Sequence, residues 1–96
     1  VNLEDAPGEG GAPVVPAERH AERIAAARRA ADDAGVAVYI NARTDTYVRK
    51  LGADDAARFD ETVRRARLYL EAGADGIFVP LAPNDAIGRL AAAIDA

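Results

Sequence analysis

The sequence of 96 residues contains no cysteine, tryptophan or methionine, and only 5% of its residues are aromatic. Without cysteine, the segment has no disulfide, no cysteine-ligated zinc site and no cysteine nucleophile. It has no apolar run near the roughly 18 residues that a membrane span needs, and no signal-peptide pattern opens it. We therefore expect a soluble, cytoplasmic protein that does not bind membranes.

Positive charge is also scarce in this chain. Its 12 lysine and arginine residues are outnumbered by 16 aspartate and glutamate residues, and the net charge of −4 argues against nucleic-acid binding. Hydrophobic residues make up 50% of the chain and charged residues 29%, which is typical of one globular domain. The chain begins with Val1 rather than methionine, inside a stretch with strand character, which suggests a piece of a longer protein.

Apolar runs and helical segments alternate along the chain. Strands are predicted over residues 1–3, 36–40 and 76–79, and helices over residues 16–34, 54–72 and from about residue 84. The two later runs are continuously apolar, which predicts strands buried on both faces. The loop over residues 6–15 is rich in glycine and proline; it could close over a site or be a disordered connector. The alternation predicts an α/β fold with parallel strands.

Two patterns indicate how the helices pack. His20 lies on the predicted inner face of the first helix, so we interpret it as a packed histidine rather than a catalytic one. In the second helix, Phe59, Val63, Ala66 and Leu70 recur at helical spacing and predict the inner stripe.

Three parallel strands do not complete an α/β domain, because they leave two open sheet edges and exposed apolar surface. A (β/α)8 barrel takes roughly 250 residues. We therefore predict that residues 1–96 form a partial barrel domain of about three β/α units. The alternative is that the chain assembles with copies of itself.

The candidate functional residues follow from one rule: in parallel α/β folds, functional groups lie at the carboxyl ends of the strands. Glu4 and Asp5 follow the first predicted strand, and Arg43 follows the second, with Asp45 two residues further on. A guanidinium there can bind a carboxylate or phosphonate bidentately; the alternative is a structural ion pair of Arg43 with Asp5 or Asp45. Glu4 suits a hard cation such as Mg²⁺, directly or through water, and the alternative is its neutralisation by Arg43.

Three strings carry a resemblance to a known family. They are Asn-Leu-Glu-Asp at residues 2–5, Asn-Ala-Arg-Thr-Asp at residues 41–45 and Glu-Ala-Gly-Ala-Asp at residues 71–75. In this order they resemble the isocitrate lyase/phosphoenolpyruvate mutase superfamily over nearly the whole chain. The resemblance implies a (β/α)8 barrel of which residues 1–96 form the fourth to sixth strands and their helices, with the N- and C-terminal parts of the parent domain absent from this chain.

The same resemblance implies a function. Members bind Mg²⁺ and a small 2-oxo or 2-hydroxy carboxylic acid, and they make or break a C–C or P–C bond through an enolate. Arg43 would be catalytic and would bind substrate together with Asn41. Glu4 would belong to the Mg²⁺ site through water, and Asp5 and Asp45 would have orienting roles. We expect the intact protein to be a homo-oligomer, and the isolated 96-residue chain to be inactive.

The chain also departs from the family pattern. The family's Mg²⁺-binding aspartates come from earlier strands. The lyases carry a Lys-(Lys/Arg)-Cys-Gly-His loop where this chain has Gly-Glu-Gly-Gly at residues 8–11. Near the position of Pro80, the lyases have a glutamate and the mutases have a histidine. A non-catalytic protein therefore stays open as the alternative: a degenerate barrel fragment that self-associates, or a binding domain that kept the scaffold.

Overall fold

The computed structural model describes residues 1–6 and 14–95, and it contains three consecutive β/α units. The elements are β1 (Asn2–Glu4), α1 (Ala17–Ala34), β2 (Asn41–Arg43), α2 (Asp55–Ala72), β3 (Gly76–Phe78) and α3 (Asn84–Asp95). The strands form one parallel sheet in the order β1-β2-β3. The predicted α/β class, element order and parallel pairing are therefore confirmed. The loop predicted over residues 6–15 falls mostly on residues 7–13, which lie outside the described residues.

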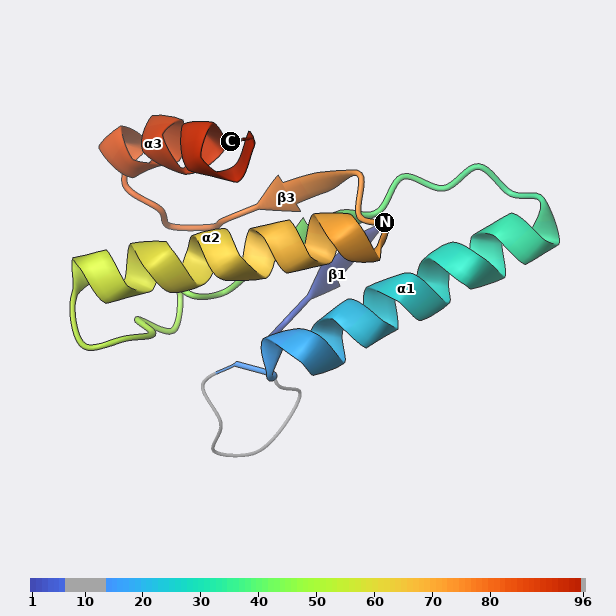
Figure 1. Cartoon of the computed structure of the whole chain (residues 1–96), viewed down its shortest axis with the longest axis horizontal. Helices are drawn as coiled ribbons and strands as arrows, with labels where there is room; N and C mark the ends of the chain where they lie inside the picture. Colours follow the sequence, from blue (N-terminus) through green and yellow to red (C-terminus); the bar gives the residue numbers. More distant parts are fainter. Residues whose placement is uncertain (7–13, 96) are drawn as a thin grey trace.

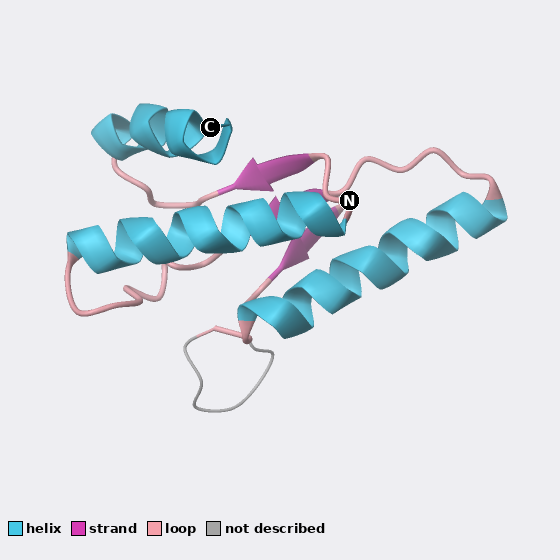
Figure 2. Ribbon diagram, viewed as in Figure 1, coloured by secondary structure: helices cyan, strands magenta, loops and turns pink. Residues whose placement is uncertain are grey.

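The helices form a layer against the sheet, and α2 packs against both α1 and α3 (Figure 1). Figure 2 shows α2 lying over the strands, between the helices α1 and α3. In none of the described segments is a helix both long and apolar enough to cross a membrane.

Helix ends follow from local chemistry. Asp54 caps α2 by accepting a hydrogen bond of 2.8 Å from the backbone N–H of Ala57, which satisfies one of the free N–H groups of the first turn. Gly35 ends α1 in a left-handed conformation with φ of 69°, which glycine adopts without strain. These local signals explain why α2 begins and α1 ends within a residue of where the sequence predicts.

The second strand is not where its apolar run predicts. Residues 36–40 were expected to be a strand buried on both faces, but β2 is Asn41–Arg43, and Val36 and Tyr39 are 55% and 63% exposed. A strand is defined by its hydrogen-bonded neighbours, and Asn41–Arg43 is the segment that lies in register with β1 and β3. The polar string was therefore the strand itself rather than its end. In the same way, β1 ends at Glu4 and β3 at Phe78.

The alternation of strand side chains divides the sheet into two faces. Leu3, Ala42 and Ile77 are register partners and belong to or pack against the hydrophobic core beneath the helices. The buried members of that core are Ala21, Ile24, Ile40, Ala42 and Tyr69. Because successive residues of a strand point to opposite faces, Glu4 and Arg43 lie on the face away from the helices.

His20 is packed in this core, as its position on the helix predicts. Its side chain is buried, Nε2 lies 3.3 Å from the carbonyl oxygen of Leu3, and its ring meets the Tyr69 ring edge-on with centroids 4.9 Å apart. Burial lowers the pKa of His20 below its usual 6.5, and this outweighs the opposing effects of the Leu3 carbonyl and the Asp5 charge. The histidine is therefore neutral in the folded protein near neutral pH.

This neutral histidine leads to a pH-dependent stability. As the pH falls below 6.5, the unfolded chain takes up a proton that folded His20 resists, because its folded pKa is lowered. Its contribution to the free energy of unfolding is therefore complete above 6.5 and is lost as the pH falls toward the folded-state pKa. We expect the difference in unfolding free energy between the wild type and His20→Gln, measured by urea titration, to shrink on acidification. A difference that stays constant with pH would contradict this expectation.

Candidate functional site

Arg43 lies between two carboxylates at the ends of β1 and β2. Its NH1 is 3.2 Å from Oε2 of Glu4, which is its register partner on β1. Its Nε donates to Oδ1 of Asp45 at 2.7 Å, and NH2 donates to Oδ2 of the same carboxylate at 3.4 Å. The structure thus brings three of the sequence-predicted residues together. Of the ion pairs weighed as alternatives to ligand binding, Arg43 makes those with Asp45 and Glu4, whereas Asp5 pairs with Arg65 instead.

The three side chains differ in how far they are exposed to solvent. The side chain of Asp45 is 2% exposed, whereas those of Arg43 and Glu4 are 33% and 51% exposed. The hydrogen bond to Asp45 raises the pKa of Arg43, so its charge is permanent. A guanidinium has five N–H donors, and Asp45 and Glu4 engage about three of them. The remaining donors are open to a ligand, while the buried Asp45 holds the head group in place.

Asp5 faces the helices instead of the open face, because it lies one residue past Glu4. Its carboxylate is fully buried. Oδ1 accepts from the backbone N–H of Asp45 at 2.8 Å, and Oδ2 accepts from the Thr44 hydroxyl at 2.7 Å. Oδ2 also accepts from the Tyr69 hydroxyl at 2.7 Å and from NH1 of Arg65 at 3.2 Å. The Asp5 carboxylate therefore joins the end of β1, the residues after β2 and helix α2.

Sequence reasoning missed the two α2 residues in this network. The inner stripe of α2 was predicted to be Phe59, Val63, Ala66 and Leu70, but the buried residues of α2 are Thr62, Arg65, Ala66 and Tyr69. Apolar periodicity cannot find an arginine that turns inward to meet a buried carboxylate. The available signal was the spacing of Arg65 and Tyr69, four residues apart and thus on one helix face.

Asn41 is placed on the same sheet face as Arg43 but at the other end of β2. It is the first residue of the strand, and its side-chain N–H donates to Oδ1 of Asn2 at 3.1 Å. Two residues along a strand span roughly 6.6 Å. The Asn41 side chain therefore lies farther from the carboxyl ends of the strands than the Arg43 side chain.

Of the three acidic residues predicted for the site, Glu4 alone has an exposed carboxylate, because Asp5 and Asp45 are buried. Among residues 1–6 and 14–95 no three histidine or acidic side chains are grouped so that they could hold a metal ion. Glu4 is half exposed and already faces the Arg43 guanidinium. This arrangement fits a carboxylate that meets Mg²⁺ through water, with its other ligands from elsewhere, and not a site complete within this segment.

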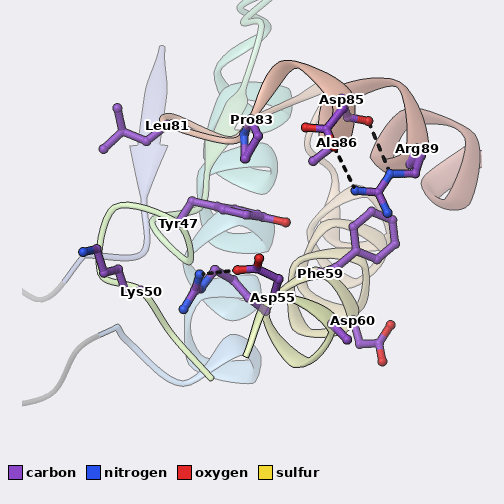
Figure 3. Close-up of a pocket in the computed structure, with 12 residues that line it drawn as sticks. Tyr47, Lys50, Asp55, Phe59, Asp60, Leu81, Pro83, Asp85, Ala86 and Arg89 are labelled. Atoms are coloured by element: carbon purple, nitrogen blue, oxygen red, sulfur yellow. Dashed lines mark hydrogen bonds and ion pairs between the residues drawn. The ribbon is translucent and has the colours of Figure 1, made fainter. Parts of the chain in front are cut away.

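A separate cavity of about 710 Å³ opens between the N-terminal ends of α2 and α3 (Figure 3). Arg58 lies over the Tyr47 ring at 5.9 Å and Arg89 over the Phe59 ring at 5.2 Å. Both arginines also pair with aspartates on their own helices, Arg58 with Asp55 and Arg89 with Asp85, and Figure 3 marks the second pair with a dashed line. Its lining contains none of the predicted site residues, and its charges are largely paired with one another, so the cavity is not the candidate site.

Comparison with known proteins decides the family. The family model described as phosphoenolpyruvate phosphomutase matches residues 1–96, the whole chain. The chain belongs to the phosphoenolpyruvate phosphomutase family. The predicted resemblance to the superfamily that contains this family is thereby confirmed, and the family is typically Mg²⁺-dependent.

Relatives within this family carry several names. The petal death protein of Dianthus caryophyllus is 46% identical over 74 residues, which are 77% of this chain and 20% of that protein. The chloroplastic carboxyvinyl-carboxyphosphonate phosphorylmutase of Arabidopsis thaliana is 44% identical over 77 residues, 78% of this chain and 20% of that protein. The chain thus spans about a fifth of these two relatives.

A solved structure from Burkholderia cenocepacia J2315 shows the same arrangement of elements. That protein, assigned as a phosphonomutase, superposes with a TM-score of 0.84 at 46% identity, over 96% of this chain and 37% of its own. A second protein of that organism, assigned as a lyase/mutase, gives a TM-score of 0.81 at 30% identity, over 99% of this chain and 33% of its own. The comparison of structures therefore agrees with the family model, because both relate this chain of three β/α units to phosphonomutase-type proteins.

Proposed function

We propose that residues 1–96 are the fourth to sixth β/α units of a (β/α)8 barrel enzyme that acts on a small 2-oxo or 2-hydroxy carboxylic acid through an enolate. The single observation that carries the proposal is the placement of Arg43. It ends a central strand, lies on the sheet face away from the helices and is anchored by a buried carboxylate. Family membership supports the same reading.

Each site residue has a chemical task in this proposal. The free guanidinium donors of Arg43 bind the carboxylate or phosphonate of the substrate and stabilise the negative charge that develops on the enolate oxygen. Asp45 holds Arg43, and Asp5 holds the Asp45 backbone, so the donors are oriented before substrate arrives. Asn41 contacts the substrate from the amino end of β2, the strand that also carries Arg43. Glu4 would help to hold Mg²⁺ through a water molecule, and the metal would supply positive charge that stabilises the enolate.

The proposal is tested by binding of oxalate, a planar dianion that mimics an enolate of pyruvate. We expect the protein that contains this chain to bind oxalate by isothermal titration calorimetry in the presence of Mg²⁺ and to bind it much more weakly after chelation. Absence of oxalate binding with Mg²⁺ present would overturn the proposal.

The role of Glu4 leads to a second prediction, in which oxalate affinity changes in opposite directions with and without Mg²⁺. Glu4→Gln removes a carboxylate that serves the metal, so we expect the gain in oxalate affinity on adding Mg²⁺ to fall about tenfold or more. Because Glu4 also repels an anion next to Arg43, metal-free oxalate binding should become slightly stronger in the same variant. Calorimetry with and without Mg²⁺ measures both effects. An unchanged gain from Mg²⁺ would show that Glu4 takes no part in the metal site.

A non-catalytic, self-associating protein is the second candidate, and a specific observation favours it. An apolar groove of about 410 Å³ runs between β3 and α3, where Phe78 and Ile87 are exposed. This candidate predicts concentration-dependent oligomers, measured by sedimentation, whose melting temperature is unaffected by Mg²⁺ and oxalate. The enzyme proposal predicts stabilisation by the two ligands together.

A further inference from the structure

Helix α2 places two polar side chains deep in the protein, against the back of the candidate site. Tyr69 is fully buried and Arg65 nearly so, although neither touches the open face of the sheet where Arg43 lies. Both reach the same oxygen of Asp5. NH1 of Arg65 also donates to the Tyr69 hydroxyl at 3.1 Å and to the Val15 carbonyl at 2.8 Å.

A continuous series of contacts leads from this pair to the guanidinium. The Tyr69 hydroxyl and Arg65 hold Oδ2 of Asp5, and Oδ1 of Asp5 holds the backbone N–H of Asp45. The carboxylate of Asp45 then holds Nε of Arg43 at 2.7 Å. Since a carboxylate is planar and rigid, fixing one of its oxygens also fixes the direction of the other. Helix α2 thus constrains the position of Asp45, which is the anchor of Arg43.

The protonation states suit this arrangement. Burial, followed by the charge of Asp5, raises the pKa of Tyr69, so its hydroxyl keeps its proton and donates. Burial acts to lower the pKa of Arg65, but hydrogen bonds to Glu61 and Tyr69 and the Asp5 charge outweigh it and keep the pKa above its usual value. Both groups therefore donate to Asp5 throughout the neutral range.

We propose that Tyr69 and Arg65 are positioning residues for Arg43, which act through Asp5 and Asp45 on the affinity of the site for its anionic ligand. The inference rests on the proposed function, because it takes Arg43 as the ligand-binding group. It adds that α2, which makes no contact with the ligand, sets how well Arg43 binds it. A purely structural network would stabilise the fold and leave ligand affinity unchanged in the folded protein.

The test compares Tyr69→Phe with Ile24→Val in the full-length protein. Tyr69→Phe removes one hydroxyl and keeps the ring in the core, so the fold is retained. Ile24→Val removes one buried methyl from the same core and no hydrogen bond, which makes it a matched structural control. At a temperature well below both melting transitions, we expect the oxalate dissociation constant with Mg²⁺ to rise about tenfold for Tyr69→Phe. For Ile24→Val we expect it to stay at the wild-type value.

Two further variants complete the experiment. Arg65→Lys keeps the positive charge but loses the forked contacts, so we expect it to weaken oxalate binding as well. In Arg43→Lys, the lysine ammonium group binds the anion as a point charge, without the orientation that Asp45 imposes on the guanidinium. Adding Tyr69→Phe to this variant should therefore have little further effect on the oxalate dissociation constant. A full tenfold effect in the Arg43→Lys background would show that Tyr69 does not act through Arg43, and would overturn the proposal.

The remaining outcomes separate this proposal from the one on which it rests. If the wild type binds oxalate with Mg²⁺ and Tyr69→Phe binds it equally well, the positioning role is wrong and the proposed function stands. If the wild type fails to bind oxalate, the proposed function is wrong and the positioning role falls with it.

Discussion

Replacing Arg43 with alanine is expected to raise the dissociation constant for oxalate in the presence of Mg²⁺ by about a hundredfold or more. Hydrogen bonds between charged groups are the strong class of hydrogen bond, and the variant loses both the donors that bind the anion and their charge. The two acidic neighbours, Glu4 and Asp45, remain and repel the ligand. Calorimetric titration of the folded variant measures the effect.

Arg29→Ala is the matched control, because Arg29 lies exposed on α1 and its loss changes the net charge by the same amount. We expect this variant to bind oxalate as the wild type does. Arg43→Lys should fall between the wild type and Arg43→Ala, since lysine keeps the charge but cannot bind two oxygens in a fixed plane. Oxalate affinity within about threefold of the wild type in Arg43→Ala would remove this residue from the site.

The second large effect concerns stability. Asp5→Ala removes the fully buried carboxylate partner of Arg65, which then keeps only the partly exposed Glu61, and it deprives Tyr69 and Thr44 of their acceptor. Breaking a buried ion pair by removing one member costs about 3 to 5 kcal/mol. We expect a fall of this size in the free energy of unfolding, measured by urea titration.

Its control is Glu18→Ala. Glu18 also pairs with an α2 arginine, Arg64, at 2.9 Å, but its side chain is 69% exposed, so we expect its loss to have little effect on the free energy of unfolding. The double variant Asp5→Ala/Arg65→Met should be more stable than Asp5→Ala alone, because the buried guanidinium group that has lost its buried partner is removed as well. If Asp5→Ala and Glu18→Ala cost the same, the buried network does not contribute as the structure implies.

The sequence predicts those parts of the fold that depend on neighbours along the chain. The two long helices end at Gly35 and Gly73, and the order of elements follows from alternating patterns. The position of β2 could not be predicted in this way, because strand bounds depend on partners about 40 residues away in sequence. The apolar run over residues 36–40 therefore indicated the wrong segment for the second strand.

The candidate site, too, could be predicted from the sequence only in part. Because parallel strands end at one edge of the sheet, the grouping of Glu4, Arg43 and Asp45 could be predicted from their positions. The contribution of Arg65 and Tyr69 could not, since a charged side chain inside a helix face contradicts the apolar pattern until its buried partner is known. The roles of Asn41, Asp5 and the site as a whole in catalysis stay predictions.

A crystal structure of the whole protein grown with Mg²⁺ and oxalate would test the assignment most directly. We predict oxalate at the carboxyl ends of β1 and β2, on the sheet face away from the helices, with its oxygens within hydrogen-bond distance of the Arg43 guanidinium and Glu4 one water away from the metal. Oxalate bound elsewhere, for example in the cavity between α2 and α3, with Arg43 still engaged only by Glu4 and Asp45, would contradict the assignment.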